Sequence, residues 1–82
     1  MINVLFFARY RDILQQDQLR LDWQEQWQTL GDVRDHLLSQ GAPWDVLDDP
    51  GIMCARNQDM CRLDTPVQQG DEIAFFPTVT GG

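Results

Sequence analysis

Hydrophobic residues dominate the opening of the chain, where Ile2–Arg9 is rich in residues that favour β-strands. In a strand, the even-numbered positions from Ile2 to Ala8 fall on one face, and Leu5 and Phe7 fall on the other. A strand that is apolar on both faces is typical of the interior of a sheet. The pattern therefore predicts a central strand.

The next apolar positions alternate strictly with polar ones. Gln18–Trp23 predicts a second strand with Leu19, Leu21 and Trp23 facing inward. Tyr10–Leu14, between the two strands, is expected to form a short helical turn. With so short a connection, we expect the two strands to pair antiparallel.

The spacing changes to the helical period after Thr29. Thr29 and Asp32 form an Asp version of the capping box, which also places negative charge at the positive end of a helix. One apolar stripe follows at helical spacing, interrupted by Arg34, whose charged end must reach solvent: Leu30, Val33, Leu37 and Leu38. Gly41 and Pro43 provide a stop. The sequence predicts one main helix here.

The last part of the chain predicts three more strands. Ile52–Arg56 and Met60–Leu63 are expected to form a hairpin around Asn57 and Gln58, although the lack of Gly disfavours a tight primed turn. Asp71–Pro77 is the last strand, a plausible central neighbour of the first. The order β-β-α-β-β-β predicts an α+β fold, a mixed five-stranded sheet around one main helix, which is the β-grasp architecture.

Composition fits one small folded domain. The 82 residues support a single core, and 43% hydrophobic and 10% aromatic residues are typical of a globule. The net charge is −7 and Lys is absent, so we expect no nucleic-acid partner. No apolar run approaches the ~20 residues that span a bilayer. We therefore expect a cytoplasmic protein that does not bind a membrane.

The chain ends in Gly81-Gly82. Glycine lacks Cβ, so such an end can carry its carboxylate into a slot too narrow for other residues. We expect a globular domain of residues 1–77 and a flexible tail of residues 78–82 that presents Gly82 to another protein. A frayed terminus without function is the alternative.

Few other residues offer chemistry. Cys54 and Cys61 should lie opposite each other in the hairpin as reduced, non-catalytic thiols, with a labile disulfide as the alternative. Besides them only His36 is a soft ligand, which is too few for a zinc site, so no metal is expected. His36 is expected to be solvated, and Asp48 and Asp49 to form a turn rather than an acid-base pair.

Two apolar residues are candidate partner anchors. Strand alternation places Ala74 and Phe76 on the face opposite Ile73 and Phe75, next to the tail. An exposed Phe76, and Met60 in the hairpin, would suit the centre of an interface. The alternative is that the protein's own loops cover this face.

The block Gly70–Gly82, together with Val4–Ala8, closely resembles the molybdopterin synthase small-subunit family, the MoaD sulfur carriers. The resemblance implies a ubiquitin-like β-grasp carrier with no intrinsic cofactor. In that family a MoeB-like adenylating enzyme uses ATP to activate the residue matching Gly82, and a sulfur-relay protein supplies sulfur that displaces AMP. The product is a thiocarboxylate at the end of the tail that includes Thr80 and Gly81.

The same resemblance implies the acceptor and the partner. The thiocarboxylate donates sulfur to cyclic pyranopterin monophosphate in a MoaE-like large subunit, which supplies the catalytic side chains and yields molybdopterin. The assembly is a heterotetramer, in which Phe76 and Met60 match positions of the family's apolar contact. This chain would thus be the non-catalytic sulfur-donor subunit of a sulfurtransferase.

Three other functions stay open at this point. A thiamine-type sulfur carrier would use the same activation, although the terminal block argues against it. A ubiquitin-like modifier would join Gly82 to a target lysine as an isopeptide. A non-enzymatic β-grasp interaction module would make no use of the glycines.

Overall fold

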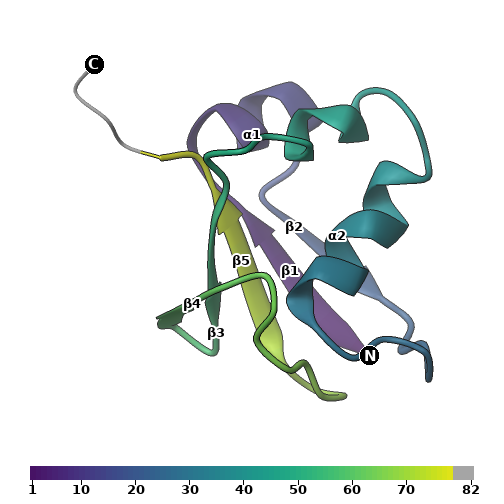
Figure 1. The fold of residues 1–82 in the computed structure, drawn as a ribbon. Coiled ribbons are helices and arrows are strands. Elements are labelled where there is room, and N and C mark those ends of the chain that lie inside the picture. The colour runs from purple at the N-terminus through teal and green to yellow at the C-terminus, as the bar shows by residue number, and fades with distance from the viewer. Residues whose placement is uncertain (79–82) are drawn as a thin grey trace.

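A computed structural model describes residues 1–78 of the chain, and Figure 1 shows its arrangement. Its strands are β1 (Ile2–Phe6), β2 (Gln18–Leu21), β3 (Met53–Arg56), β4 (Asp59–Cys61) and β5 (Glu72–Phe76). Its helices are α1 (Ala8–Leu14), α2 (Leu30–Leu38) and the short 3₁₀ helix η1 (Trp44–Leu47). None of the helices within residues 1–78 has the length and apolarity needed to cross a membrane.

The five strands form one mixed sheet in the order β2-β1-β5-β3-β4. β1 and β5 run parallel, with Val4 opposite Ile73, and the other neighbouring strands run antiparallel. The predicted pairing of the first two strands and the central place of the first and last are both confirmed. The result is the ubiquitin-like β-grasp fold that the sequence predicts.

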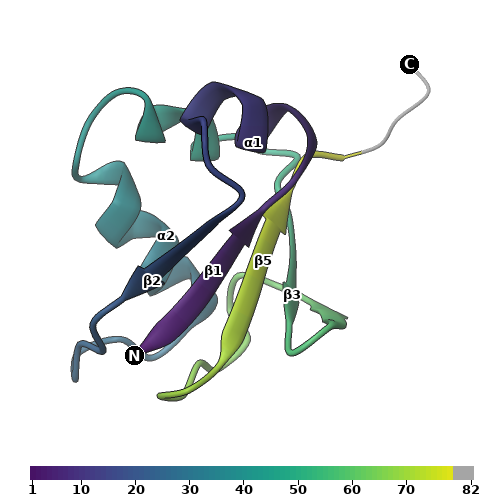
Figure 2. The ribbon, with the colours of Figure 1, turned by 180° about the vertical axis from the view of Figure 1, so that it is seen from behind.

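The core lies between the sheet and the helices. Figures 1 and 2 show α2 over one face of the sheet and α1 above the ends of β1 and β5. Inward residues of β1 and β5 meet the apolar stripe of α2, and the fully enclosed side chains include Val4, Phe6, Leu30, Val33, Leu37, Ile73 and Phe75. Leu38 packs at the edge of this core. The inward faces are therefore those that periodicity predicts.

The start of α2 matches the predicted capping box. Thr29 Oγ1 accepts a hydrogen bond from the Asp32 N–H at 3.3 Å, and the Asp32 carboxylate accepts one from the Thr29 N–H at 3.1 Å. The two contacts satisfy backbone donors that a helix start would leave unpaired. This helix is thus defined by residues adjacent in sequence.

The first strand is shorter than predicted. β1 ends at Phe6, and Ala8 is exposed and begins α1 with a φ of 53°. The Phe7 carbonyl accepts hydrogen bonds from the N–H groups of Tyr10 and Arg11, which starts the helix at this point. The early turn allows α1 to bury Tyr10, and this burial outweighs the apolar continuation of the strand.

The β3–β4 hairpin has a tight turn, although the lack of Gly disfavours one. Asn57 and Gln58 both have positive φ, at 51° and 73°. The Asn57 side chain accepts a hydrogen bond from the Glu72 N–H at 2.9 Å and donates one to Asp71 at 3.1 Å. Asn tolerates this backbone region better than most residues, and these two bonds stabilise it there.

Candidate functional site

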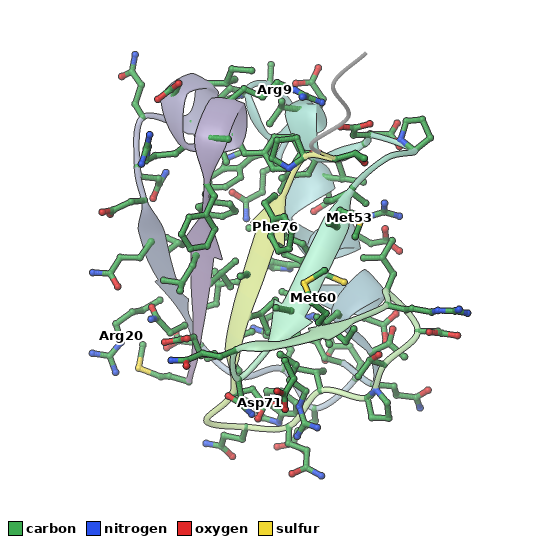
Figure 3. The ribbon with its side chains drawn as sticks, turned by 90° about the vertical axis from the view of Figure 1, so that its left-hand side faces the viewer. Arg9, Arg20, Met53, Met60, Asp71 and Phe76 are labelled. Atoms are coloured by element: carbon green, nitrogen blue, oxygen red, sulfur yellow. The ribbon has the colours of Figure 1, made fainter. Side chains whose placement is uncertain are left out.

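The two sides of β5 differ sharply. Ile73 and Phe75 are fully buried, whereas Ala74 and Phe76 lie on the opposite face and are partly exposed. In Figure 3 the Phe76 side chain lies on the face of the sheet that is turned toward the viewer, together with those of Met53 and Met60. The predicted alternation is confirmed, and it brings Phe76 to the surface two residues before the end of the described chain.

Four large apolar side chains form a surface patch on this side, which we call the outer patch: Phe7, Met53, Met60 and Phe76. Met53 is opposite Phe76 in the β3–β5 register, and the rings of Phe7 and Phe76 meet edge to face at 6.4 Å. Phe7 is 45% exposed and Met60 is 60% exposed. The protein's own described loops therefore do not cover the patch.

The outer patch is larger than sequence reasoning indicated. Phe76 and Met60 were candidates, but Phe7 and Met53 were not. Met53 could have been found from the register of the strands. Cys54 pairs with Cys61 on one side and with Phe75 on the other, and this register places the preceding residue, Met53, beside Phe76. The sequence alone gave no β3–β5 register.

Thr80, Gly81 and Gly82 lie outside the described residues, so their role stays a prediction, as does the division into residues 1–77 and 78–82. The chain can be followed to the base of the expected tail. Pro77 is buried, and the exposed Thr78 donates its hydroxyl hydrogen bond to the Gly51 carbonyl.

The Asp49 carboxylate accepts several hydrogen bonds close to the start of the expected tail. Its Oδ2 accepts one from Arg9 and one from the Tyr10 hydroxyl, each at 2.6 Å, and its Oδ1 accepts one from the Gly51 N–H at 2.9 Å. The Tyr10 hydroxyl and the Gly51 N–H lower the pKa of Asp49, against the effect of desolvation. Asp49 thus does more than form a turn, whereas Asp48 is exposed.

A second group of hydrogen bonds surrounds the carboxylate of Asp71, directly before the start of β5. Asp71 is 7% exposed and accepts hydrogen bonds from Arg56 Nε at 2.6 Å, the Gln68 N–H at 2.7 Å and Asn57 Nδ2 at 3.1 Å. Burial acts to raise the pKa of Asp71, but these hydrogen bonds outweigh it and hold the pKa below its ordinary value. Figure 3 shows Asp71 far from Phe76 along the sheet, so this cluster supports the fold rather than the patch.

The two cysteines are direct cross-strand neighbours, as predicted. Their sulfur atoms lie 3.8 Å apart, and both are free thiols. Burial, and next the adjacent Cys61, raise the pKa of Cys54 to about 12, so this thiol is a poor nucleophile at neutral pH. Within residues 1–78, no group of three or more His, Cys, Asp or Glu side chains could hold a metal ion.

The interpretation of His36 as a solvated residue is wrong. The imidazole is half-buried and packs edge-on against the Trp27 ring at 5.3 Å, and Trp27 in turn meets Trp23. Trp27 is largely buried, and the His36 ring shields one side of it from solvent.

Comparison with known proteins decides the family, since residues 4–82 match the ThiS family over nearly the whole chain. This chain belongs to the ThiS/MoaD family. A chain from Haemophilus influenzae named molybdopterin synthase sulfur carrier subunit is 42% identical over 83 residues, with both chains covered completely. A protein of the same name from Escherichia coli is 39% identical, again with complete coverage of both chains.

Solved structures of family-like chains share the fold. The crystal structure of SAMP1 from Haloferax volcanii superposes with a TM-score of 0.76 at 26% identity, covering 99% of this chain and 98% of that one. A chain from the complex of subunits 1 and 2 of the Helicobacter pylori molybdopterin-converting factor superposes with a TM-score of 0.64 at 23% identity, covering 99% and 97%. These likenesses agree with the ubiquitin-like β-grasp architecture.

Proposed function

We propose that this chain is the sulfur-carrier subunit of a molybdopterin synthase in molybdenum cofactor biosynthesis. The observation that carries the proposal is the full-length similarity, at 42% and 39% identity, to two proteins of that name. The Gly81-Gly82 end and the outer patch support it. They supply the two parts a carrier needs, a slender reactive end and a docking surface.

In this proposal the Gly82 carboxylate is the working group. A carboxylate is a poor acyl donor, so a separate activating enzyme joins it to AMP at the expense of ATP and releases pyrophosphate. The terminal sulfur of a persulfide on a relay protein then displaces AMP and forms an acyl disulfide. A thiol attacks the relay-side sulfur of that bond, becomes a disulfide with the relay protein, and releases the thiocarboxylate at Gly82. That sulfur is donated to cyclic pyranopterin monophosphate in the large subunit, and the carrier returns to a carboxylate.

The folded body serves docking in this scheme. Phe76 and Met60 anchor the large subunit, with Phe7 and Met53 extending the contact. Exposed aromatic and Met side chains of this kind are enriched at the centres of interfaces. Phe76 lies six positions before Gly82 in the sequence, so docking of the patch brings the tail to the partner's active site.

A ubiquitin-like protein modifier is the second candidate. The observation that favours it is the 26% identity to SAMP1, whose name in a second crystal structure from the same organism is small archaeal modifier protein 1. A modifier shares the first activation step but ends as an isopeptide on a target lysine. The fate of the Gly82 acyl group separates the two functions.

Intact-mass spectrometry tests the proposal. The chain is co-expressed with an adenylating enzyme and a sulfur source, and we expect a mass gain equal to the replacement of one oxygen by sulfur. Adding the large subunit and cyclic pyranopterin monophosphate should remove this gain and form molybdopterin. A chain lacking Gly82 is the control, with unchanged thermal stability and no sulfur acceptance. Large conjugates without a thiocarboxylate would favour the modifier instead.

A further inference from the structure

The base of the expected tail is attached to the loop before β3. The Thr78 hydroxyl donates a hydrogen bond to the Gly51 carbonyl, 27 residues away in sequence. A Cβ added at Gly51 would lie 2.7 Å from Thr78 Oγ1, closer than a Cβ comes to its neighbours, so the Thr78 side chain would have to shift. The absence of a side chain at position 51 therefore leaves the space in which Thr78 makes this contact.

The loop that holds Thr78 is in turn fixed to α1. The Gly51 N–H donates to Asp49 Oδ1 at 2.9 Å, and Asp49 Oδ2 accepts from Arg9 and from the Tyr10 hydroxyl at 2.6 Å each. Tyr10 is completely buried, so this contact reaches the core. A continuous series of hydrogen bonds thus joins the core of the domain to the base of the tail.

We propose that Asp49 and Gly51 are positioning residues that fix, through Thr78, the direction in which the tail leaves the body. This inference rests on the proposed function, because its consequence is efficient sulfur transfer. The four residues 79–82 extend at most about 14 Å at full stretch. With so short a stalk, a change of direction at Thr78 moves Gly82 out of a fixed acceptor site, and effective concentration at that site falls.

The role is one of orientation rather than affinity. The outer patch contacts the partner, whereas the Thr78–Gly51 contact lies within one chain. Loss of the contact should therefore lower the rate of transfer within the assembled complex and leave the affinity for the large subunit unchanged. A residue needed only for folding would instead change stability and both measurements together.

The test compares thiocarboxylated variants of the full chain in complex with the large subunit. Thr78→Val replaces the hydroxyl by a methyl group, and Thr78→Ser keeps it. One hydrogen bond at the surface changes the population of a tail orientation by about threefold to tenfold, and we expect Thr78→Val to slow single-turnover transfer by this factor. Affinity should stay within about twofold of the original chain, and Thr78→Ser should transfer at the original rate.

Two further variants make the result decisive. Gly51→Ala should slow transfer at least as much as Thr78→Val, because the new methyl group displaces Thr78. Thr65→Val is the matched control, since the Thr65 hydroxyl accepts a hydrogen bond from the Arg62 N–H in a turn of its own, and it should leave the rate unchanged. Thermal unfolding of each variant shows whether the fold persists.

The outcomes separate the inference from the proposed function. If the original chain transfers sulfur and Thr78→Val and Gly51→Ala match its rate, the positioning role is wrong and the carrier function stands. Equal loss of affinity and rate in Thr78→Val would also overturn it, because Thr78 would then belong to the interface. If the original chain accepts no sulfur at all, the proposed function fails and the inference falls with it.

Discussion

Phe75 and Phe76 are consecutive residues of one strand, yet they lie in opposite environments. Phe75 is fully buried between the sheet and the helices, whereas Phe76 lies on the outer face beside Met53 and Met60 (Figure 3). Residue type cannot explain the difference, since both are phenylalanine. The period of two in a strand turns Phe75 toward the core and Phe76 toward the face opposite α2. We therefore expect Phe75 to serve stability and Phe76 to serve association.

The same division extends across the neighbouring strands. Cys54 faces the core and is 2% exposed, while Met53 before it belongs to the outer patch and is 37% exposed. Burial of large apolar side chains stabilises the fold, whereas exposed ones lower the free energy only when a partner covers them. Substitutions on the two faces should therefore change different quantities.

The largest effect on stability should come from the inner face. Phe75→Ala leaves a cavity in the core, and we expect a loss of about 3–5 kcal/mol in the free energy of unfolding, measured by urea denaturation. Phe76→Ala is the matched control and should cost about 1 kcal/mol or less, because the ring is partly exposed already. Equal losses in the two variants would contradict the separation of the faces.

The next effect concerns binding. Phe76→Asp places a carboxylate in the outer patch, and we expect the affinity for the large subunit to fall by at least about 2 kcal/mol, because that charge would be desolvated without a partner. Isothermal titration calorimetry measures the affinity, and circular dichroism shows that the fold persists. An affinity equal to that of the original chain would remove Phe76 from the interface.

A smaller effect on stability is expected from Asp71, which lies directly before β5. The pKa of Asp71 in the folded protein lies below the ordinary value for an aspartate. The stabilisation that its carboxylate provides is therefore complete above the ordinary pKa, and it is lost as the pH falls through the folded-state pKa. Asp71→Asn should cost about 1–2 kcal/mol at neutral pH and reduce the decline of stability toward acid. Urea denaturation over a series of pH values checks both. An unchanged acid decline would show that Asp71 does not carry this dependence.

The smallest effect belongs to the edge of the outer patch. Met60 is 60% exposed, so Met60→Ala should change the free energy of unfolding by no more than about 0.5 kcal/mol. Its affinity for the large subunit should fall less than that of Phe76→Asp, because residues around a hot spot contribute less than its centre. A larger loss than for Phe76→Asp would move the centre of the interface to the hairpin.

Most of the fold could be predicted because its signals are local. Thr29 and Asp32 are three residues apart and define the start of α2 by themselves. The turn at Asn57 could not be predicted with the same certainty, because it is stabilised by Asp71 and Glu72, fourteen and fifteen residues away. The contacts of Asp49 with α1 span 39 and 40 residues and leave no periodic signal in the sequence.

Part of the candidate site could likewise be predicted from local signals, and part of it depends on contacts between residues that are distant in sequence. Strand alternation alone placed Phe76 on the outer face, but Phe7 and Met53 needed the register between strands that are distant in sequence. The contact between Thr78 and Gly51 could not be predicted, because a glycine in a turn and a threonine outside the expected strand belong to no hydrophobic pattern in the sequence. Periodicity reveals which face a residue occupies, and only tertiary structure reveals its neighbours there.

The central place of β5 has a mechanical consequence. β5 is hydrogen-bonded to β1 on one side and to β3 on the other, and it is the strand that continues into the C-terminal residues. Tension applied to the C-terminus by a partner would load both ladders lengthwise, so that many bonds resist together rather than breaking one at a time. The domain should therefore resist a pull on its C-terminal end better than a domain whose last strand lies at the edge of the sheet.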